Sequence, residues 1–232
     1  MKANIKVIAF DADDTLWVNE TYFRDAELQF AHLLSNYETI NKIDQELFKT
    51  EIDNLQYYGY GIKGFVLSMI ECALELSNNN LNPKIIAQIL EIGKEMLEKP
   101  IELLDGVEDV LAYLSTKYKL IVATKGDLLD QERKLEKSGL LNYFHHVEVM
   151  SDKSEKDYQK LIKHLDIAPN QFLMIGNSLK SDVLPLLSIG SNAIHIPFHT
   201  TWAHEEVAGQ NQINNNYLTV SSLIDLKSII KF

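Results

Sequence analysis

The chain is poor in cysteine and in arginine, and both shortages exclude classes of protein. Cys72 is the single cysteine among 232 residues, so an intrachain disulfide and a thiolate cage for a metal are both excluded. Arg24 and Arg133 are the only arginines, and the formal net charge is −11 at pH 7. Because a negatively charged surface repels polyanions, nucleic acid is not expected as a partner.

Long hydrophobic runs are also missing. Before Asp11 the chain offers only the apolar stretch 5–10, which is too short for a secretion signal or a spanning helix. The longer stretch 65–76 is interrupted by Glu71 and Glu75. We therefore expect a cytoplasmic protein with no membrane partner. Hydrophobic residues make up 46% and charged residues 24%, which is typical of a folded globular chain.

Hydrophobic patterning predicts an α/β framework that is interrupted by a helical block. Residues 7–10 form a short apolar run that ends at acidic residues, as a buried strand does. The helical period that follows predicts four helices, at about 21–39, 43–57, 62–77 and 83–98. Beyond Pro100, strand-like runs alternate with helical segments. The strands are expected at 120–123, 147–149, 172–175 and 193–196, and the helices near 127–138, 155–165 and 180–188.

This alternation predicts the fold class and the domain boundaries. Strands alternating with helices form right-handed crossovers, so we expect an α/β fold with a Rossmann-like parallel sheet and helices on both faces. The helical block would be an inserted α-helical cap domain, residues 18–99. The catalytic core domain would then be assembled from residues 1–17 and 100–232. Ligands of such sheets bind outside the carboxyl ends of the strands, so the residues that follow each strand are the candidates for chemistry.

Three acidic residues are expected to meet at that edge of the sheet. Asp11 and Asp13 follow the first strand and are two residues apart, so their carboxylates lean to one side of extended chain. Asp182 follows the fourth strand. An oxygen-rich group of this type suits Mg²⁺, which would also offset the repulsion between a carboxylate nucleophile and a phosphate. We predict Asp11, Asp13 and Asp182 as ligands of Mg²⁺.

The same strand ends offer groups for phosphoryl transfer. Asp11 can attack phosphorus in line, and Asp13 is placed to protonate the leaving oxygen and later to accept a proton from water. Thr124, which follows the second strand, can donate its hydroxyl to a phosphoryl oxygen. Lys153, which follows the third, can pair with the charge on the transferring group and keep Asp11 ionised.

These strand ends resemble the motifs of a known superfamily. Residues 10–16, Phe-Asp-Ala-Asp-Asp-Thr-Leu, resemble the first motif of the haloacid dehalogenase-like (HAD) superfamily, Asp-x-Asp-x-Thr-Leu. Thr124 resembles the second motif, Lys153 the third, and the segment 176–182, Gly-Asn-Ser-x-x-x-Asp, the fourth. The resemblance covers most of the chain. It implies a phosphatase with an aspartyl-phosphate intermediate and a C1-type cap over a small substrate.

Two positions depart from the pattern of the superfamily. Asn177 stands where aspartate is more common, so it is predicted to orient a water, to bind the metal weakly or to contact the phosphate. Asp14 stands where glycine is usual; its backbone amide is expected to serve the phosphate while its charge points away. Together with Thr124, Lys125 and Lys153, these two residues complete the predicted phosphate site.

Several choices stay open at this point. Lys156 lies near Lys153, but Lys153 is closer to the strand end and precedes Tyr158 at the spacing that the superfamily's third motif shows. The segment 57–64, rich in tyrosine and glycine, is either a substrate-facing loop or packing within the helical domain. Zinc is not expected, because no tight His-x-x-x-His pattern is present. The remaining candidates for a zinc ligand are the histidines of the last strand and the loop after it, His195, His199 and His204.

The predicted activity is the Mg²⁺-dependent hydrolysis of a small phosphomonoester, a phosphorylated metabolite, by a monomer or homodimer. Alternatives within the superfamily are a 2-haloacid dehalogenase, against which Asp13 argues, and a phosphomutase. From other classes, a phosphoacceptor signalling protein would carry its aspartate after the third strand. A non-catalytic phosphate-binding protein would be favoured by loss of Asp11 or Asp13, and both are present.

Overall fold

The computed structural model describes residues 4–207 and 217–230, and these form two compact units. As far as the structure describes them, Met1–Glu20, Ile101–Lys125 and Gln131–Phe232 form the first unit. Thr21–Pro100 and Gly126–Asp130 form the second. We call them the sheet unit and the helical unit. The five residues after the second strand therefore group with the helices, a detail that the sequence pattern did not predict.

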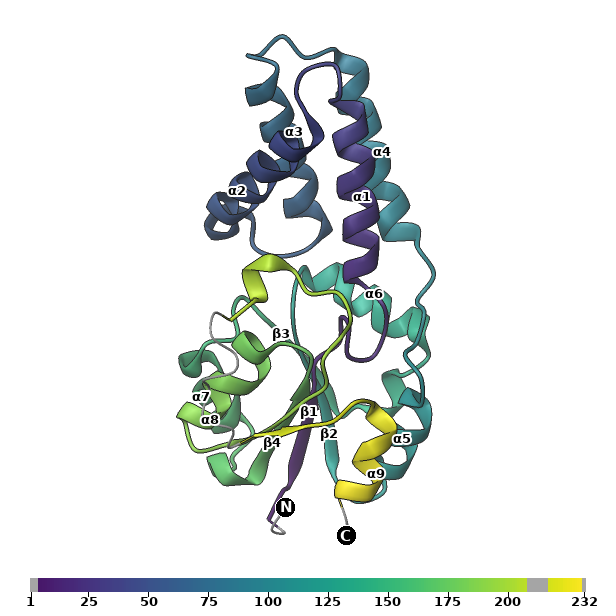
Figure 1. The fold of residues 1–232 in the computed structure, drawn as a ribbon. Coiled ribbons are helices and arrows are strands. Elements are labelled where there is room, and N and C mark those ends of the chain that lie inside the picture. The colour runs from purple at the N-terminus through teal and green to yellow at the C-terminus, as the bar shows by residue number, and fades with distance from the viewer. Residues whose placement is uncertain (1–3, 208–216, 231–232) are drawn as a thin grey trace. The chain divides into compact units, whose positions relative to one another are not determined.

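The sheet unit contains a parallel β-sheet with the strand order β3-β2-β1-β4-β5-β6 (Figure 1). All of its strand pairs are parallel, which confirms the Rossmann-like α/β prediction. The strands are β1 (Val7–Phe10), β2 (Lys119–Lys125), β3 (His146–Met150), β4 (Phe172–Gly176), β5 (Asn192–His195) and β6 (Leu218–Thr219). The short β6 lies beyond the last predicted strand. Because β1 is flanked by β2 and β4, the chain reverses its direction of winding at β1.

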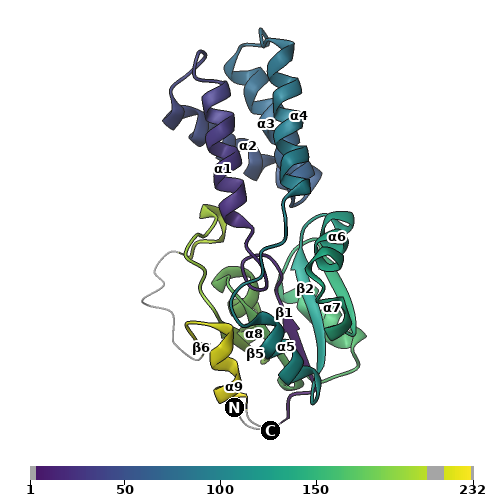
Figure 2. The ribbon, with the colours of Figure 1, turned by 90° about the vertical axis from the view of Figure 1, so that its right-hand side faces the viewer.

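The two faces of the sheet carry separate apolar clusters, as the period of two along each strand requires. In β1, Ile8 and Phe10 face a cluster that includes α5 and α9, whereas Val7 and Ala9 face one built with α7 and α8. Figures 1 and 2 show these helix pairs on opposite sides of the strands. Because helices cover both faces of the sheet, β1 and β4 are continuous hydrophobic runs.

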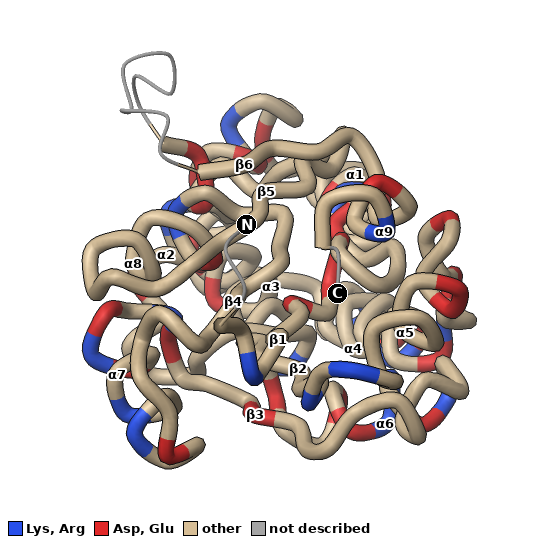
Figure 3. The backbone as a smooth tube through the Cα atoms, turned by 90° about the horizontal axis from the view of Figure 1, so that it is seen from below, with Lys and Arg blue, Asp and Glu red and all other residues tan. Residues whose placement is uncertain are grey.

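Helices of the sheet unit lie close to the predicted ranges, with three differences. They are α5 (Val107–Ser115), α6 (Leu128–Ser138), α7 (Glu155–His164), α8 (Leu184–Ser188) and α9 (Leu226–Ile229). Neither α5 nor the short α9 was predicted, although the buried residues of α5 recur with a helical spacing. The segment expected as one helix at 180–188 is divided into a five-residue π-helical turn, η3 (Leu179–Val183), and α8. α7 carries acidic residues in its first turn and basic residues in its last turn (Figure 3).

The helical unit consists mainly of α1 (Glu20–Leu33), α2 (Ile40–Tyr58), α3 (Ile62–Leu76) and α4 (Pro83–Glu98). Their apolar faces share one core that contains Phe30, Leu47 and Met69. α1 ends six residues before the predicted boundary, because the chain turns at residues 34–37 while Tyr37 still packs on that core. None of the helices in the described ranges is long and apolar enough to cross a membrane.

The tyrosine-rich segment 57–64 lies in the helical unit. Tyr57 is 73% exposed, and the hydroxyl of the half-exposed Tyr58 donates a hydrogen bond to Glu71. Lys63 forms an ion pair of 2.8 Å with Asp127, which belongs to the segment after β2. A contact between this loop and the substrate stays a prediction.

Candidate active site

The cluster of polar side chains at the carboxyl edge of the sheet begins at Asp11. The Asp11 N–H donates to the carbonyl of Ile175 at 2.9 Å, so the pairing of β1 with β4 continues one residue past the strand. This contact fixes the backbone of Asp11 at the point where the winding of the sheet reverses, the usual location of ligand sites in such folds. The Asp11 side chain is almost fully buried there.

Lys153 joins the two acidic strand ends. Its Nζ atom lies 2.5 Å from Asp11 Oδ1 and 2.6 Å from Asp182 Oδ1, and all three side chains are less than a tenth exposed. Lys156, the rival from the sequence pattern, is exposed to solvent. The structure thus brings Asp11, Lys153 and Asp182 together and leaves Lys156 outside the cluster.

Burial dominates the electrostatics of this trio. It raises the pKa of Asp11 to about 7, with Lys153 opposing the shift and the Asp182 charge adding to it. Burial alone would lower the pKa of Lys153, but the carboxylates of Asp11 and Asp182 raise it above its ordinary value. The lysine therefore stays charged, and its ammonium opposes the effect of burial on the pKa of Asp11.

Asp182 is held by the turn η3. Its Oδ2 atom accepts a hydrogen bond from the Ser178 N–H at 3.1 Å, and Ser178 Oγ accepts one from the Ser181 N–H at 3.0 Å. The carboxylate lies so close to Gly176 that a Cβ atom at position 176 would overlap it. The glycine of this segment is therefore required by the position of the carboxylate.

Asp13 lies in a frame of three donors. Its Oδ1 atom accepts hydrogen bonds from Trp17 Nε1 at 2.7 Å and from Lys134 Nζ at 3.0 Å, and its Oδ2 atom accepts one from Gln131 Nε2 at 2.8 Å. Sequence reasoning missed Gln131 and Lys134. The available signal was their spacing of three residues, which places both on one face of α6.

Thr124 and Lys125, at the end of β2, have partners of their own. The buried Thr124 hydroxyl donates to the carbonyl of Lys125 at 3.1 Å. Lys125 Nζ lies 2.5 Å from Glu205 Oε1 and 3.0 Å from Ser181 Oγ. Glu205 also accepts from the hydroxyls of Ser178 and Ser181, at 2.5 and 2.6 Å. The predicted phosphate ligand Lys125 is thus already paired with a carboxylate that sequence reasoning did not single out.

The Asp14 side chain is buried. Its carboxylate accepts hydrogen bonds from the N–H groups of Asn19 and Glu20, near the start of α1. Its own N–H donates to the carbonyl of Trp17 at 2.7 Å, and its φ angle is 61°. Burial raises the pKa of Asp14 to about 8, although the two backbone donors oppose the shift.

Asn177 connects the first and fourth motifs. Its Oδ1 atom accepts from the Thr15 hydroxyl at 3.3 Å, and the same hydroxyl lies 3.2 Å from Asp11 Oδ2. His195 Nε2 contacts the Asn177 carbonyl at 2.9 Å, and His204 lies beside Lys180. These two histidines therefore contact backbone or lysine rather than each other.

The donor set around Lys153 suits a hard cation, although the three predicted ligands do not surround one point. Across the part of the chain that the structure describes, no three acidic, histidine or cysteine side chains are grouped to hold a metal. Asp11 and Asp182 approach a shared ammonium, whereas Asp13 is turned to Trp17 and the α6 side chains. Carboxylate oxygens are nevertheless the ligands that Mg²⁺ prefers. A bound cation would offset the cost of burying the Asp11 charge, and that burial is what raises the pKa of Asp11.

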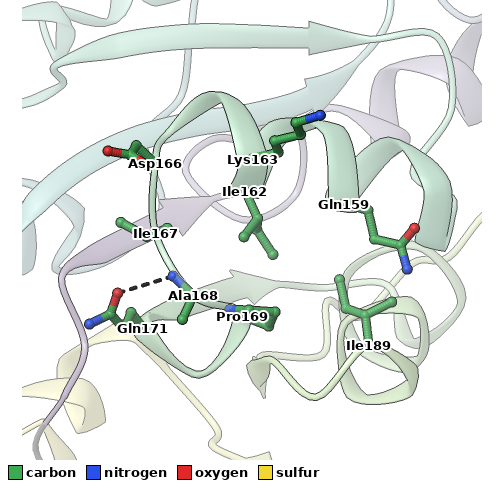
Figure 4. Close-up of a pocket in the computed structure, with 9 residues that line it drawn as sticks. All are labelled: Gln159, Ile162, Lys163, Asp166, Ile167, Ala168, Pro169, Gln171 and Ile189. Carbon is green, nitrogen blue, oxygen red and sulfur yellow. Dashed lines mark hydrogen bonds between the residues drawn. The ribbon is translucent and has the colours of Figure 1, made fainter.

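A pocket of about 510 Å³ lies at the other end of β4 (Figure 4). It is lined by the end of α7, by Ile189 and by the segment before β4, in which the Ala168 N–H donates to Gln171 Oε1 at 3.0 Å. Because ligands of parallel sheets bind at the carboxyl ends of the strands, this pocket is not the candidate active site.

A strand-end cluster of this composition on a parallel sheet is the arrangement of a hydrolase of the HAD type, and comparison with known proteins agrees. Residues 5–190 match the family described as haloacid dehalogenase-like hydrolase. The chain therefore belongs to this family. A search among curated protein sequences gives no match.

Solved structures extend the likeness over the whole chain. A haloacid dehalogenase-like family hydrolase from Xanthomonas campestris is 37% identical, with a TM-score of 0.86 over 98% of this chain and 91% of its own. The HAD-hydrolase YfnB from Bacillus subtilis, described as bound to magnesium, is 17% identical, with a TM-score of 0.67 over 99% and 100%. A 2-haloacid dehalogenase from Pseudomonas syringae is 16% identical, with a TM-score of 0.62 over 97% of each chain. The last two show a shared fold only.

Proposed function

We propose that this protein is a cytoplasmic, Mg²⁺-dependent phosphohydrolase that cleaves a small phosphomonoester through an aspartyl-phosphate on Asp11. The observation that carries the proposal is the contact of Lys153 with both Asp11 and Asp182 at the carboxyl edge of the sheet. These three residues supply a nucleophile, a fixed positive charge and a second carboxylate within one buried cluster. Asp13, on the same loop as Asp11, supplies an acid–base group.

In the first step, an Asp11 carboxylate oxygen forms a bond to phosphorus while the ester P–O bond breaks. The leaving alkoxide takes a proton from Asp13 and departs as an alcohol. The ammonium of Lys153 and the hydroxyl of Thr124 would stabilise the charge on the transferring phosphoryl oxygens. The aspartyl-phosphate remains on the enzyme.

In the second step, water attacks the phosphorus of the aspartyl-phosphate. Asp13, now ionised, accepts a proton from that water, so the bond between Asp11 and phosphorus breaks and inorganic phosphate leaves. Asp11 and a protonated Asp13 are regenerated. Both steps need Asp11 and Asp13 on one loop, and the turn at residues 11–17 holds them there.

Asp11 and Asp182 would hold the metal, with Asn177 nearby. A bound Mg²⁺ supplies positive charge that favours approach of the anionic carboxylate to an anionic phosphate. Lys153 already contacts both carboxylates, so the two cations would share them. The YfnB structure, described as bound to magnesium, supports this assignment through a shared fold.

The fold alone does not separate phosphatases from dehalogenases, since a 2-haloacid dehalogenase has a similar structure. Asp13 separates them chemically, because a dehalogenase that attacks carbon releases halide, which needs no proton. A phosphomutase would instead return the phosphoryl group to its substrate. No contact of the described residues favours that route over transfer to water.

The decisive experiment measures phosphate released from a panel of phosphorylated metabolites with Mg²⁺ and with EDTA. We expect release that depends on Mg²⁺ and is lost in Asp11→Asn, while circular dichroism shows that the variant folds. Chloride release from 2-chloropropionate, assayed in parallel, is expected to be absent. Substantial turnover by Asp11→Asn, or dehalogenation without phosphate release, would end the proposal.

A further inference from the structure

We propose that Gln131 is a positioning residue that fixes the carboxylate of Asp13 relative to the end of β2. The inference rests on the proposed function, because it matters only if Asp13 exchanges protons with the substrate. Gln131 lies in α6, outside the four strand-end motifs, and its side chain is 3% exposed. Its contacts join the loop after β1 to the residues that end β2.

One nitrogen atom makes these contacts. Gln131 Nε2 lies 2.8 Å from Asp13 Oδ2, 2.7 Å from the Lys125 carbonyl and 3.2 Å from Thr124 Oγ1. An amide nitrogen carries two hydrogens, and the two short contacts use both of them. The orientation is therefore fixed, because the reversed amide would place an acceptor oxygen against the Asp13 carboxylate and the Lys125 carbonyl.

The other end of the amide is unpaired. Gln131 Oε1 is buried and has no hydrogen-bond partner among the residues that the structure describes. Buried polar atoms are usually paired, and exceptions need an explanation. An amide kept only for packing would be expected to satisfy both of its ends. Here the nitrogen donates to Asp13 and to the Lys125 carbonyl at the end of β2, although the buried oxygen is left without a hydrogen bond.

Gln131 has a role that the other two donors to Asp13 do not share. Trp17 and Lys134 both bind Asp13 Oδ1, whereas Gln131 is the donor to Oδ2. If Gln131 lost its N–H groups, the contacts at Oδ1 alone would have to resist rotation of the whole carboxylate about its Cβ–Cγ bond. The carboxylate would remain in the cluster but would no longer present a defined oxygen to the leaving group.

This defect has a chemical signature. An alkoxide leaving group needs a proton in the transition state, whereas a nitrophenolate departs readily without one. A misdirected Asp13 therefore slows cleavage of an alkyl phosphate far more than cleavage of p-nitrophenyl phosphate. A loss of packing around α6 would slow both substrates alike.

The test compares kcat/KM for p-nitrophenyl phosphate and for the alkyl phosphate that the wild type hydrolyses fastest. We expect Gln131→Met, which keeps the length of the side chain without its donors, to lose about 100-fold on the alkyl phosphate, the lower end of the usual acid–base contribution. On p-nitrophenyl phosphate the loss should stay within a few fold. Glu136→Ala, at an exposed position of the same helix, is the matched control and should behave as wild type.

A double-mutant cycle supplies the second readout. In the Asp13→Asn background, Gln131→Met should cause no further loss that depends on the leaving group. Both changes remove the same function, which is proton donation to the leaving group. Equal losses on the two substrates, or additive losses in the cycle, would overturn the inference. If circular dichroism shows that Gln131→Met does not fold, Gln131→Asn is judged by the same criteria. Failure of the proposed function looks different, since the wild type would then release no phosphate at all.

Discussion

Gly176 and Asp182 are packed so closely that the carboxylate of the aspartate occupies the place where a side chain at position 176 would begin. Gly176 ends β4, and Asp182 lies one turn later in η3. The absence of a side chain at 176 thus lets the turn fold back over the strand end. The position of one carboxylate in the cluster therefore depends on a residue that has no functional group.

Gly176→Ala should displace Asp182 and weaken Mg²⁺-dependent turnover. We expect destabilisation of about 1–3 kcal/mol, typical of an overpacked site, together with a higher Mg²⁺ concentration for half-maximal activity. Gly139→Ala is the control, because its φ of 74° makes alanine strained while no atom lies near the new Cβ. That variant should lose stability without a change in its Mg²⁺ requirement. An unchanged requirement in Gly176→Ala would contradict the steric argument.

Lys153→Met should be both inactive and less stable. Removing the ammonium leaves Asp11 and Asp182 buried without their shared cation, and breaking a buried ion pair typically costs about 3–5 kcal/mol. Urea denaturation and phosphate release measure the two effects. Lys156→Met, at the exposed neighbouring lysine, should match wild type in both. Loss of activity in Lys156→Met with retention in Lys153→Met would reverse the assignment.

Asp14→Asn should change how stability depends on pH. The pKa of Asp14 is raised to about 8, so the wild type has its full stability below the unfolded-state pKa near 4 and loses it as the pH rises toward 8. The amide can still accept from the N–H groups of Asn19 and Glu20. The stability advantage of the variant should therefore grow between pH 4 and 8, by at most about 1.4 kcal/mol per pH unit.

Thermal unfolding of wild type and Asp14→Asn from pH 5 to pH 9 checks this expectation. Asp105→Asn, at an exposed position of the sheet unit, is the matched control. If the unfolding temperatures of wild type and Asp14→Asn depend on pH in the same way, ionisation of the buried Asp14 carboxylate does not cause the pH dependence of stability.

Glu205→Gln should have the opposite pH dependence. Burial alone would raise the pKa of Glu205, but Lys125 and the hydroxyls of Ser178 and Ser181 lower it to about 2. A lowered pKa stabilises the protein above the unfolded-state value near 4.5, and that stability is lost as the pH falls toward 2. We expect Glu205→Gln to cost about 3–4 kcal/mol at pH 7, since the pKa is lowered from 4.5 to about 2 and one pKa unit corresponds to about 1.4 kcal/mol.

The deficit of Glu205→Gln relative to wild type should shrink below pH 4. Glu206→Gln, at the exposed next residue, provides the control and should leave stability unchanged at every pH. A deficit of the same size at pH 3 and pH 7 would mean that the contacts of Glu205, rather than its charge, stabilise the loop.

Local patterns in the sequence were sufficient to predict most of the helices and strands. β1 begins and ends where the apolar run does, and α3 and α4 lie within one residue of their predicted limits. These elements are amphipathic or fully buried, so their periodicity reports their surroundings directly. The predicted helix at 21–39 ran too far because Tyr37 keeps the apolar spacing while lying in a turn.

What the sequence by itself determined was the order of strands and helices and the set of polar residues at the strand ends, including Asp11, Lys153 and Asp182. Only the tertiary structure decided which side chains these residues contact. Lys153 lies 142 residues from Asp11, and Gln131 lies 118 residues from Asp13. The hydrophobic periodicity of a segment reports which of its own residues are buried. Pairing over such separations depends on how whole elements pack, so no local pattern reports it.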